Sequence, residues 1–147
     1  LVSWWTGETL VSIENNGLEK DWFVSKRKGF YEINGSLTGK FSSGSSLKLV
    51  SENKEMDFSI HLRSSKDQWY FDYSNNGFFG PNNFNIPGKE MLQSELATCL
   101  VDEILDNESC ELTFVKDNLG QFKILLSFFL DHWNNSNKSF SNKIPIT

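Results

Sequence analysis

The chain contains few cysteines and few histidines, which limits the chemistry that it can carry. Its 147 residues include two cysteines, Cys99 and Cys110, and two histidines, His61 and His132. Two cysteines are too few for a disulfide framework, and a zinc site would also need both of the distant histidines. We therefore expect free, buried thiols, no metal site and no cofactor.

Basic residues and long apolar runs are also scarce. The 14 lysines and arginines face 19 acidic residues, which gives a net charge of -5. Proteins that bind nucleic-acid phosphates need a basic surface, so we expect no direct nucleic-acid partner. The longest apolar candidate, residues 124–130, is too short to cross a membrane. We predict a cytoplasmic protein, and secretion stays open because the sequence begins with Leu1 rather than Met.

Motifs that identify an active site are absent as well. The sequence contains no G-x-S-x-G, H-E-x-x-H, P-loop or C-x-x-C pattern. His61 follows Asp57 and Ser59 on the polar face of a predicted strand, a pattern typical of a solvated surface. We therefore expect no enzyme, and an enzyme that uses His61 with Asp57 is the least favoured hypothesis.

Aromatic side chains, in contrast, are abundant. They make up 14% of the chain, and 13 of them are phenylalanines. The length is close to the commonest domain size, so we predict a single domain over residues 1–147 with a core built on rings. We expect Trp4 and Trp5 to complete this core, and we predict that residues 1–8 and 134–147 can fray.

The first half of the chain reads as a series of short strands. Runs of β-branched and aromatic residues alternate with clusters of Gly, Asn and Ser, as in an antiparallel meander. We predict strands at residues 9–14, 22–26, 30–41, 47–51, 56–62 and 68–73. The predicted class is α+β, with an antiparallel β-meander of about 6–8 strands arranged as a sandwich or a partly open barrel.

The second half contains a loop, a helix and an ambiguous segment. Prolines and glycines predict a long ordered loop over residues 75–88, and leucines spaced at three and four residues predict an amphipathic helix over 89–106. Residues 109–116 and 121–128 flank a turn sequence that ends in Gly120, which favours a β-hairpin. A helix over 119–133 also fits, because the same apolar residues have a period of 3.6.

The aromatic stretch at residues 68–84 supports a small-ligand hypothesis. Alternation places Trp69, Phe71 and Tyr73 on one face of a strand and Tyr70 on the other. A core role is favoured for the stripe, and Tyr70 is the better candidate for an exposed contact. The alternative function is a barrel or sandwich that binds a small apolar or carbohydrate ligand. Its candidate ligand residues are Trp69, Phe71, Tyr73, Phe78 and Phe79.

Acidic residues concentrate in one window, and this feature of the sequence points most directly to a function. Residues 89–117 carry a charge of -6, whereas the rest of the chain sums to +1. Concentrated carboxylates steer and hold basic partners. The predicted contact residues are Asp102, Glu103, Asp106, Glu108 and Tyr70.

In size, acidity, lack of a catalytic signature and mixed sheet-plus-helix layout, the chain resembles the small immunity proteins that neutralise bacterial toxins, without a shared motif. This resemblance implies a non-enzymatic inhibitor that occludes the active site of a basic toxin or nuclease. No feature of the sequence predicts an oligomeric state.

Overall fold

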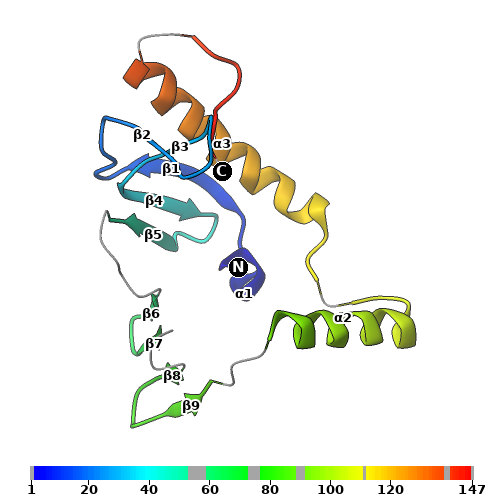
Figure 1. Cartoon of the computed structure of the whole chain (residues 1–147). Helices are drawn as coiled ribbons and strands as arrows, with labels where there is room; N and C mark the ends of the chain where they lie inside the picture. The colour runs from blue at the N-terminus through cyan, green and yellow to red at the C-terminus, as the bar shows by residue number, and fades with distance from the viewer. Residues whose placement is uncertain are drawn as a thin grey trace. The chain divides into compact units, whose positions relative to one another are not determined.

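The computed structural model describes residues 2–52, 59–72, 77–88, 92–110, 112–137 and 140–146, apart from the side chain of Trp4. This part of the chain forms helices and antiparallel strands (Figure 1), which confirms the α+β class. The helices are α1 (Val2–Thr6), α2 (Gln93–Asn107) and α3 (Val115–Asn137). The strands are β1 (Leu10–Asn15), β2 (Phe23–Val24), β3 (Tyr31–Glu32), β4 (Gly35–Phe41), β5 (Ser46–Ser51), β6 (Ser59–Arg63), β7 (Gln68–Asp72), β8 (Gly77–Phe79) and β9 (Asn85–Pro87).

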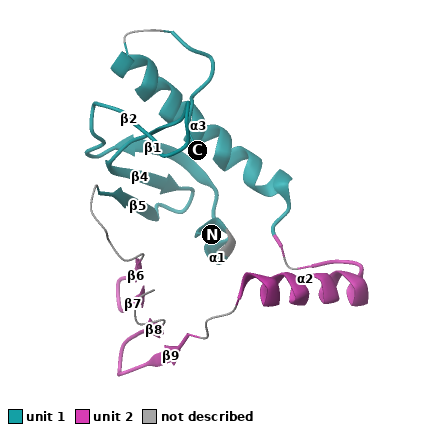
Figure 2. Ribbon diagram, in the orientation of Figure 1, with its two compact units in different colours: residues 1–53, 113–147 teal, residues 54–112 magenta. Residues whose placement is uncertain are grey.

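The chain divides into two compact units (Figure 2). Unit 1 joins Leu1–Asn53 to Thr113–Thr147, and unit 2 is Lys54–Leu112. The described strands make three sheets, β1-β4-β5, β2-β3 and β6-β7-β8-β9, and these sheets do not close into a barrel. The prediction of one folding domain stays a prediction.

β4 is the central strand of unit 1. It pairs with β1 on one side and β5 on the other, and its residues Leu37, Thr38 and Phe41 are buried. The predicted strand over residues 30–41 is split into β3 and β4, which belong to different sheets. Gly35, the first residue of β4, has a φ of 115°, a backbone conformation that residues with a Cβ rarely adopt.

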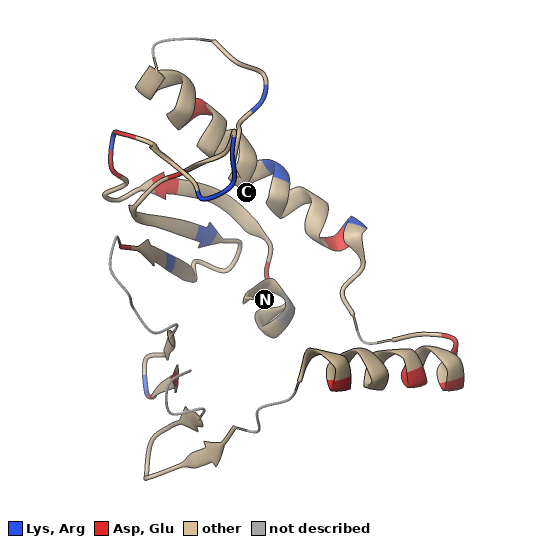
Figure 3. Cartoon of the chain, viewed as in Figure 1, with Lys and Arg blue, Asp and Glu red and all other residues tan. Residues whose placement is uncertain are grey.

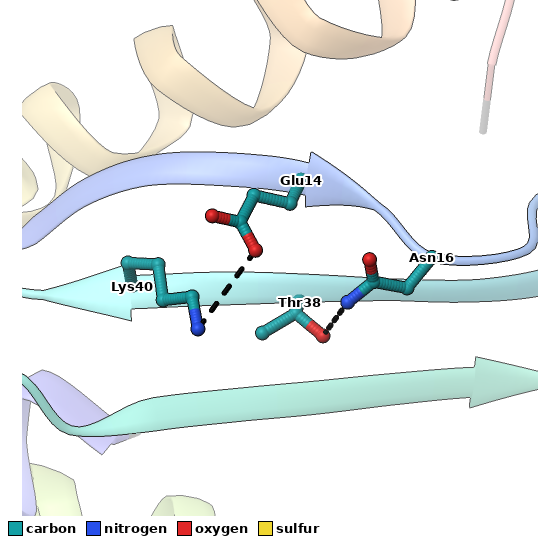
Figure 4. A network of polar contacts seen from close by, with 4 residues as sticks. All are labelled: Glu14, Asn16, Thr38 and Lys40. Carbon is teal, nitrogen blue, oxygen red and sulfur yellow. Dashed lines mark hydrogen bonds and ion pairs between the residues drawn. The ribbon is translucent and has the colours of Figure 1, made fainter.

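Two polar contacts link β4 to β1 and to Asn16, which directly follows β1 (Figure 4). The amide Nδ2 of Asn16 donates to Thr38 Oγ1 at 2.6 Å, so the buried hydroxyl of Thr38 has a partner. Glu14 and Lys40 form an ion pair at 3.8 Å. Both of these charged side chains are largely exposed, so we expect the ion pair to stabilise the sheet by less than about 1 kcal/mol.

The predicted hairpin over residues 109–128 is wrong. Val115–Asn137 is one helix, α3, which packs along β1. The apolar residues of this segment fit both periods, and the helical period brings Ile124, Phe128 and Phe129 onto the face of α3 that lies towards the sheet and the β2–β3 hairpin. Tertiary packing therefore overrides the turn signal that ends in Gly120.

The C-terminal segment pairs with β3 where the structure describes it, and the fraying of the two ends stays a prediction. α3 continues to Asn137, and the N–H of Tyr31 donates to the carbonyl of Pro145 at 2.8 Å. Tyr31 also forms a parallel bridge with Ile146. At the other end, residues 2–6 form the short helix α1, in which Trp5 is 44% exposed and so does not complete the core.

Unit 2 contains the meander β6-β7-β8-β9 and the helix α2. The long loop predicted over residues 75–88 is wrong, since β8 and β9 form a hairpin there. Asn82 and Asn83 both have positive φ and turn the chain tightly, and Gly80 N–H donates to the Phe84 carbonyl at 2.8 Å. Pro87 is tolerated because β9 is an edge strand.

The helix predicted over residues 89–106 is confirmed as α2, with residues 89–91 outside the described part of the chain. Its first turn is capped by Glu95, whose Oε2 accepts from the backbone N–H of Leu92 at 2.9 Å. It ends where Glu108 adopts a left-handed conformation with a φ of 54°. The side chain of Glu108 is therefore placed at the terminus of α2, next to its last turn.

Candidate functional site

The predicted acidic contact residues lie on α2 and at its C-terminal end. Asp102 and Asp106 are one helical turn apart, and Glu95 lies on the same side of the helix two turns earlier. Figure 3 shows acidic residues along one side of α2. Glu103 lies round the helix from this stripe and is half-buried. Residues 92–110 contain no lysine or arginine, so this segment carries only negative formal charge.

An apolar row occupies the opposite side of α2. Leu96, Leu100 and Ile104 follow one another at four-residue intervals, with Val101 and Leu105 beside them. Leu96 and Ile104 are each nearly half exposed, and Leu105 is 75% exposed. Burying a leucine or isoleucine stabilises a protein by about 1.5–3 kcal/mol. No residue of α2 is buried in the described chain. The apolar row therefore contributes little of this stabilisation to the fold.

Tyr70 is the fifth predicted contact residue, and it lies on β7 in the sheet β6-β7-β8-β9. Its ring stacks on His61 of β6 at 6.0 Å and on Phe79 of β8 at 4.8 Å, with interplanar angles of 19° and 16°. These residues are cross-strand neighbours on one face of the sheet. Tyr70 is 42% exposed, as predicted. Because both faces of its ring are covered by neighbouring rings, a flat ligand cannot stack on it without separating the column.

Most residues of the small-ligand hypothesis lie against other residues of unit 2. Trp69 lies against Gly80, where an added Cβ would sit 2.5 Å from the indole ring. Phe78 meets Phe84 edge to face at 6.4 Å, and Phe71 is the cross-strand neighbour of Phe78. Tyr73 lies outside the described residues. The hypothesis of a ligand on this sheet stays a prediction, without a specific contact in its favour.

His61 and its neighbours do not form a recognisable catalytic group in the described chain. His61 is exposed, and its Nε2 lies 3.4 Å from Ser59 Oγ. Asp57, its proposed partner, lies outside the described residues. Among the residues that the structure describes, no three His, Cys, Asp or Glu side chains come together as a metal site would require. Cys99 and Cys110 are free as predicted, but Cys99 is exposed rather than buried.

A cluster of rings on α3 was not predicted from the sequence. Trp22 meets Phe129, His132 and Trp133 at centroid distances of 6.1, 5.7 and 5.3 Å, all in edge-to-face geometry. Trp133 in turn meets Tyr31 at 5.0 Å. These contacts join the β2–β3 hairpin to the last turns of α3. The signal in the sequence was the helical spacing of Phe129, His132 and Trp133, which the hairpin interpretation obscured.

His132 is the polar member of this cluster. The indole N–H of Trp22 donates to Nδ1 of His132 at 3.2 Å, so the neutral ring carries its proton on Nε2. Burial lowers the pKa of His132 below the ordinary histidine value. The ring is therefore neutral near pH 7, and its protonation would remove the acceptor that the Trp22 indole uses.

α3 also exposes an apolar stripe along its first half. Val115, Leu119, Phe122 and Leu126 recur at four, three and four residues, and each is exposed. A strand interpretation would have divided these side chains between two faces. The exposed stripe is thus a second apolar surface that the sequence analysis did not identify.

Comparison of the chain with models of known protein families, with curated proteins and with solved structures found no match. No helix in the described residues has the length and apolar character needed to span a bilayer. Evidence for function therefore comes from the surfaces of the chain itself. Among them, α2 combines a stripe of carboxylates with an unburied apolar row on a single element.

Proposed function

We propose that this chain is a non-enzymatic protein-binding protein whose helix α2 docks on a basic partner. The observation that carries the proposal is the large exposure of the apolar row on a helix whose charged side chains are all acidic. Exposed apolar surface of this kind is typical of an interaction site, and an amphipathic helix docks by laying its apolar face in a groove.

The two sides of α2 have different roles in this proposal. The apolar row around Leu96 and Ile104 enters the partner's groove and supplies affinity. Asp102 and Asp106 lie on the opposite side, so they act at the rim of the groove and through long-range attraction. Rim charges mainly change the association rate and its salt dependence, whereas buried contacts mainly change dissociation.

The finer form of the proposal is an immunity-type inhibitor that covers the active site of a basic toxin or nuclease. The net charge of -5 and its concentration near α2 support a basic partner. Acidic surfaces that imitate a polyanionic substrate suit such an enzyme, because the charge that attracts the substrate also attracts the inhibitor.

The test uses the whole chain as bait in a lysate of its native host, followed by purification of the captured basic protein and surface plasmon resonance. Asp102→Lys with Asp106→Lys should slow association about tenfold or more at low salt and leave little salt dependence. Leu96→Ser with Ile104→Ser should accelerate dissociation, because both side chains belong to the apolar row. The control, Asp117→Lys with Asp131→Lys, makes the same charge change on α3 and should leave both rates close to those of the wild type.

Circular dichroism should show that every variant is folded, since all the substituted side chains are exposed. Inhibition is measured separately, as the loss of the partner's nuclease activity when the chain is added. Equal association rates for the wild type and the α2 charge variant would contradict docking through α2. A partner that binds without loss of activity would retain the binding function and reject the inhibitor.

A further inference from the structure

A small aromatic groove lies within unit 1, between the β2–β3 hairpin, α3 and the C-terminal segment. Its volume is about 230 Å³. Aromatic residues from three parts of the chain line it, and they are Trp22, Phe23, Tyr31 and Phe129. Drug-sized ligands occupy pockets of about 300–1,000 Å³, so this groove suits a single side chain better than a whole small molecule.

The rings of the groove are held in place by neighbours outside it. The indole N–H of Trp22 is bound to His132, and the ring of Tyr31 lies against Trp133. The polar edge of the Trp22 indole is therefore satisfied, and the ring is held by its contacts with Phe129, His132 and Trp133. Rings that are fixed before binding lose little conformational entropy when a ligand arrives.

The charge of the groove selects the sign of its ligand. Glu32 is its one charged lining residue, whereas Lys and Arg do not line it. Glu32 is the cross-strand neighbour of Phe23, so the carboxylate and this ring lie on the same face of the hairpin. A neutral ligand that covered Glu32 would desolvate the carboxylate without pairing it, and an anion would be repelled. A cation would satisfy both the carboxylate and the ring of Phe23.

A second depression in unit 1 lacks this selectivity. It lies between β1 and α3, has a volume of about 440 Å³, and is lined by Lys123 as well as Asp131. Opposite charges at its edge give no preference for a ligand of either sign. The aromatic groove differs from this depression because its charged lining residue, Glu32, is acidic and no basic residue lines it.

We propose that the aromatic groove binds an arginine side chain of a basic protein partner. Arginine fits better than lysine because a planar guanidinium can stack on an aromatic face and pair with a carboxylate through two parallel hydrogen bonds. The same attraction occurs within the chain, where the guanidinium of Arg27 lies over the ring of Phe30 at 5.7 Å. The inference relies on the proposed function only for the basic nature of the partner, and it places a second contact on unit 1.

The test is titration of the isotopically labelled whole chain with N-acetyl-arginine methylamide, followed by NMR. The neutral isostere N-acetyl-citrulline methylamide serves as the matched ligand control, and N-acetyl-lysine methylamide as the second cation. We expect the arginine probe to shift the indole N–H signal of Trp22 and the amide signals of Tyr31 and Glu32. The lysine probe should bind more weakly, and the citrulline probe should cause no comparable shift.

Two variants make the result specific. Glu32→Gln removes the carboxylate at an exposed position and should weaken arginine binding about tenfold. The control Glu19→Gln makes the same change at an exposed residue outside the groove and should leave the affinity unchanged.

The charge variant of α2, Asp102→Lys with Asp106→Lys, should still bind the arginine probe. A failure of docking through α2 is thereby distinguished from a failure of the groove. Equal binding of arginine and citrulline, unchanged affinity in Glu32→Gln, or shifts that map away from Trp22 and Tyr31 would overturn the proposal.

Discussion

Gly35 offers a sharp test of how the sheet of unit 1 is built, because the structure leaves no room there for a side chain. Its φ is 115°, and a Cβ added to it would overlap the carbonyl oxygen of Gly17 and lie 2.6 Å from the Cα of Leu18. Both neighbours are backbone atoms. The Gly17 carbonyl is also held by a hydrogen bond from the N–H of Ser36 at 3.2 Å, so it cannot easily move away.

The expected cost of Gly35→Ala follows from two contributions. A left-handed conformation costs a residue with a Cβ about 1–2 kcal/mol, and overpacking costs a further 1–3 kcal/mol or so. We therefore expect the free energy of unfolding to fall by about 2–5 kcal/mol. Gly44 is a matched control, since its φ is 94° but an added Cβ would meet nothing within 4 Å. Gly44→Ala should cost only the conformational part.

The assay is urea denaturation followed by tryptophan fluorescence and, independently, by far-UV circular dichroism. The difference between the two variants isolates the overlap with the Gly17 backbone from the cost of positive φ. Equal losses of stability in Gly35→Ala and Gly44→Ala would refute the close approach of β4 to the bend after β1. A loss in Gly44→Ala alone would refute the positive φ assigned to Gly35 as well.

Two further predictions concern the aromatic cluster on α3. Because burial lowers the pKa of His132, the folded state binds fewer protons than the unfolded state, so stability should decrease as the pH falls below about 6.5 and level off below the folded-state pKa. Urea denaturation across this range should show the decrease in the wild type and not in His132→Gln, and an identical pH profile in the two proteins would reject it. Trp133→Ala should lower the free energy of unfolding by about 2–3 kcal/mol, since this half-buried ring meets both Trp22 and Tyr31. Trp5→Ala, at an exposed position, should cost less than about 1 kcal/mol in the same measurement, and similar costs for the two would show that the cluster contributes little.

The local patterns of the sequence predicted much of the fold. Runs of β-branched and aromatic residues between turn clusters located β1, β5 and β7, and the leucine spacing located α2. The wrong predictions of a hairpin over 109–128 and of a loop over 75–88 have separate causes. The segment around Phe122 and Leu125 satisfies both the strand and the helix period, and packing against β1 decides between them. At β8 and β9, Pro87 and two asparagines with positive φ disguised a tight hairpin as a loop.

The candidate sites differ in how far they could be foreseen. The stripe of Glu95, Asp102 and Asp106 depends on spacing within one helix, so the sequence alone places it. The aromatic groove depends on contacts such as that of Trp22 with His132, which are separated by 110 positions. Periodicity within one helix or strand cannot predict a contact between residues so far apart in the sequence. The exposure of the apolar row on α2 was equally unpredictable, since the leucine pattern normally indicates a buried face.

The discontinuity of unit 1 has a consequence for synthesis on the ribosome. Its sheet comes from the first part of the chain, whereas α3 and the segment that pairs with Tyr31 come from the last part. At about 5–20 residues per second, the nascent sheet waits roughly 5–20 s for translation of the helix that covers it. During that interval the surface of β1 that α3 covers in the folded chain is exposed. This interval is when a chaperone that shields nascent β-strands would have its greatest effect on yield.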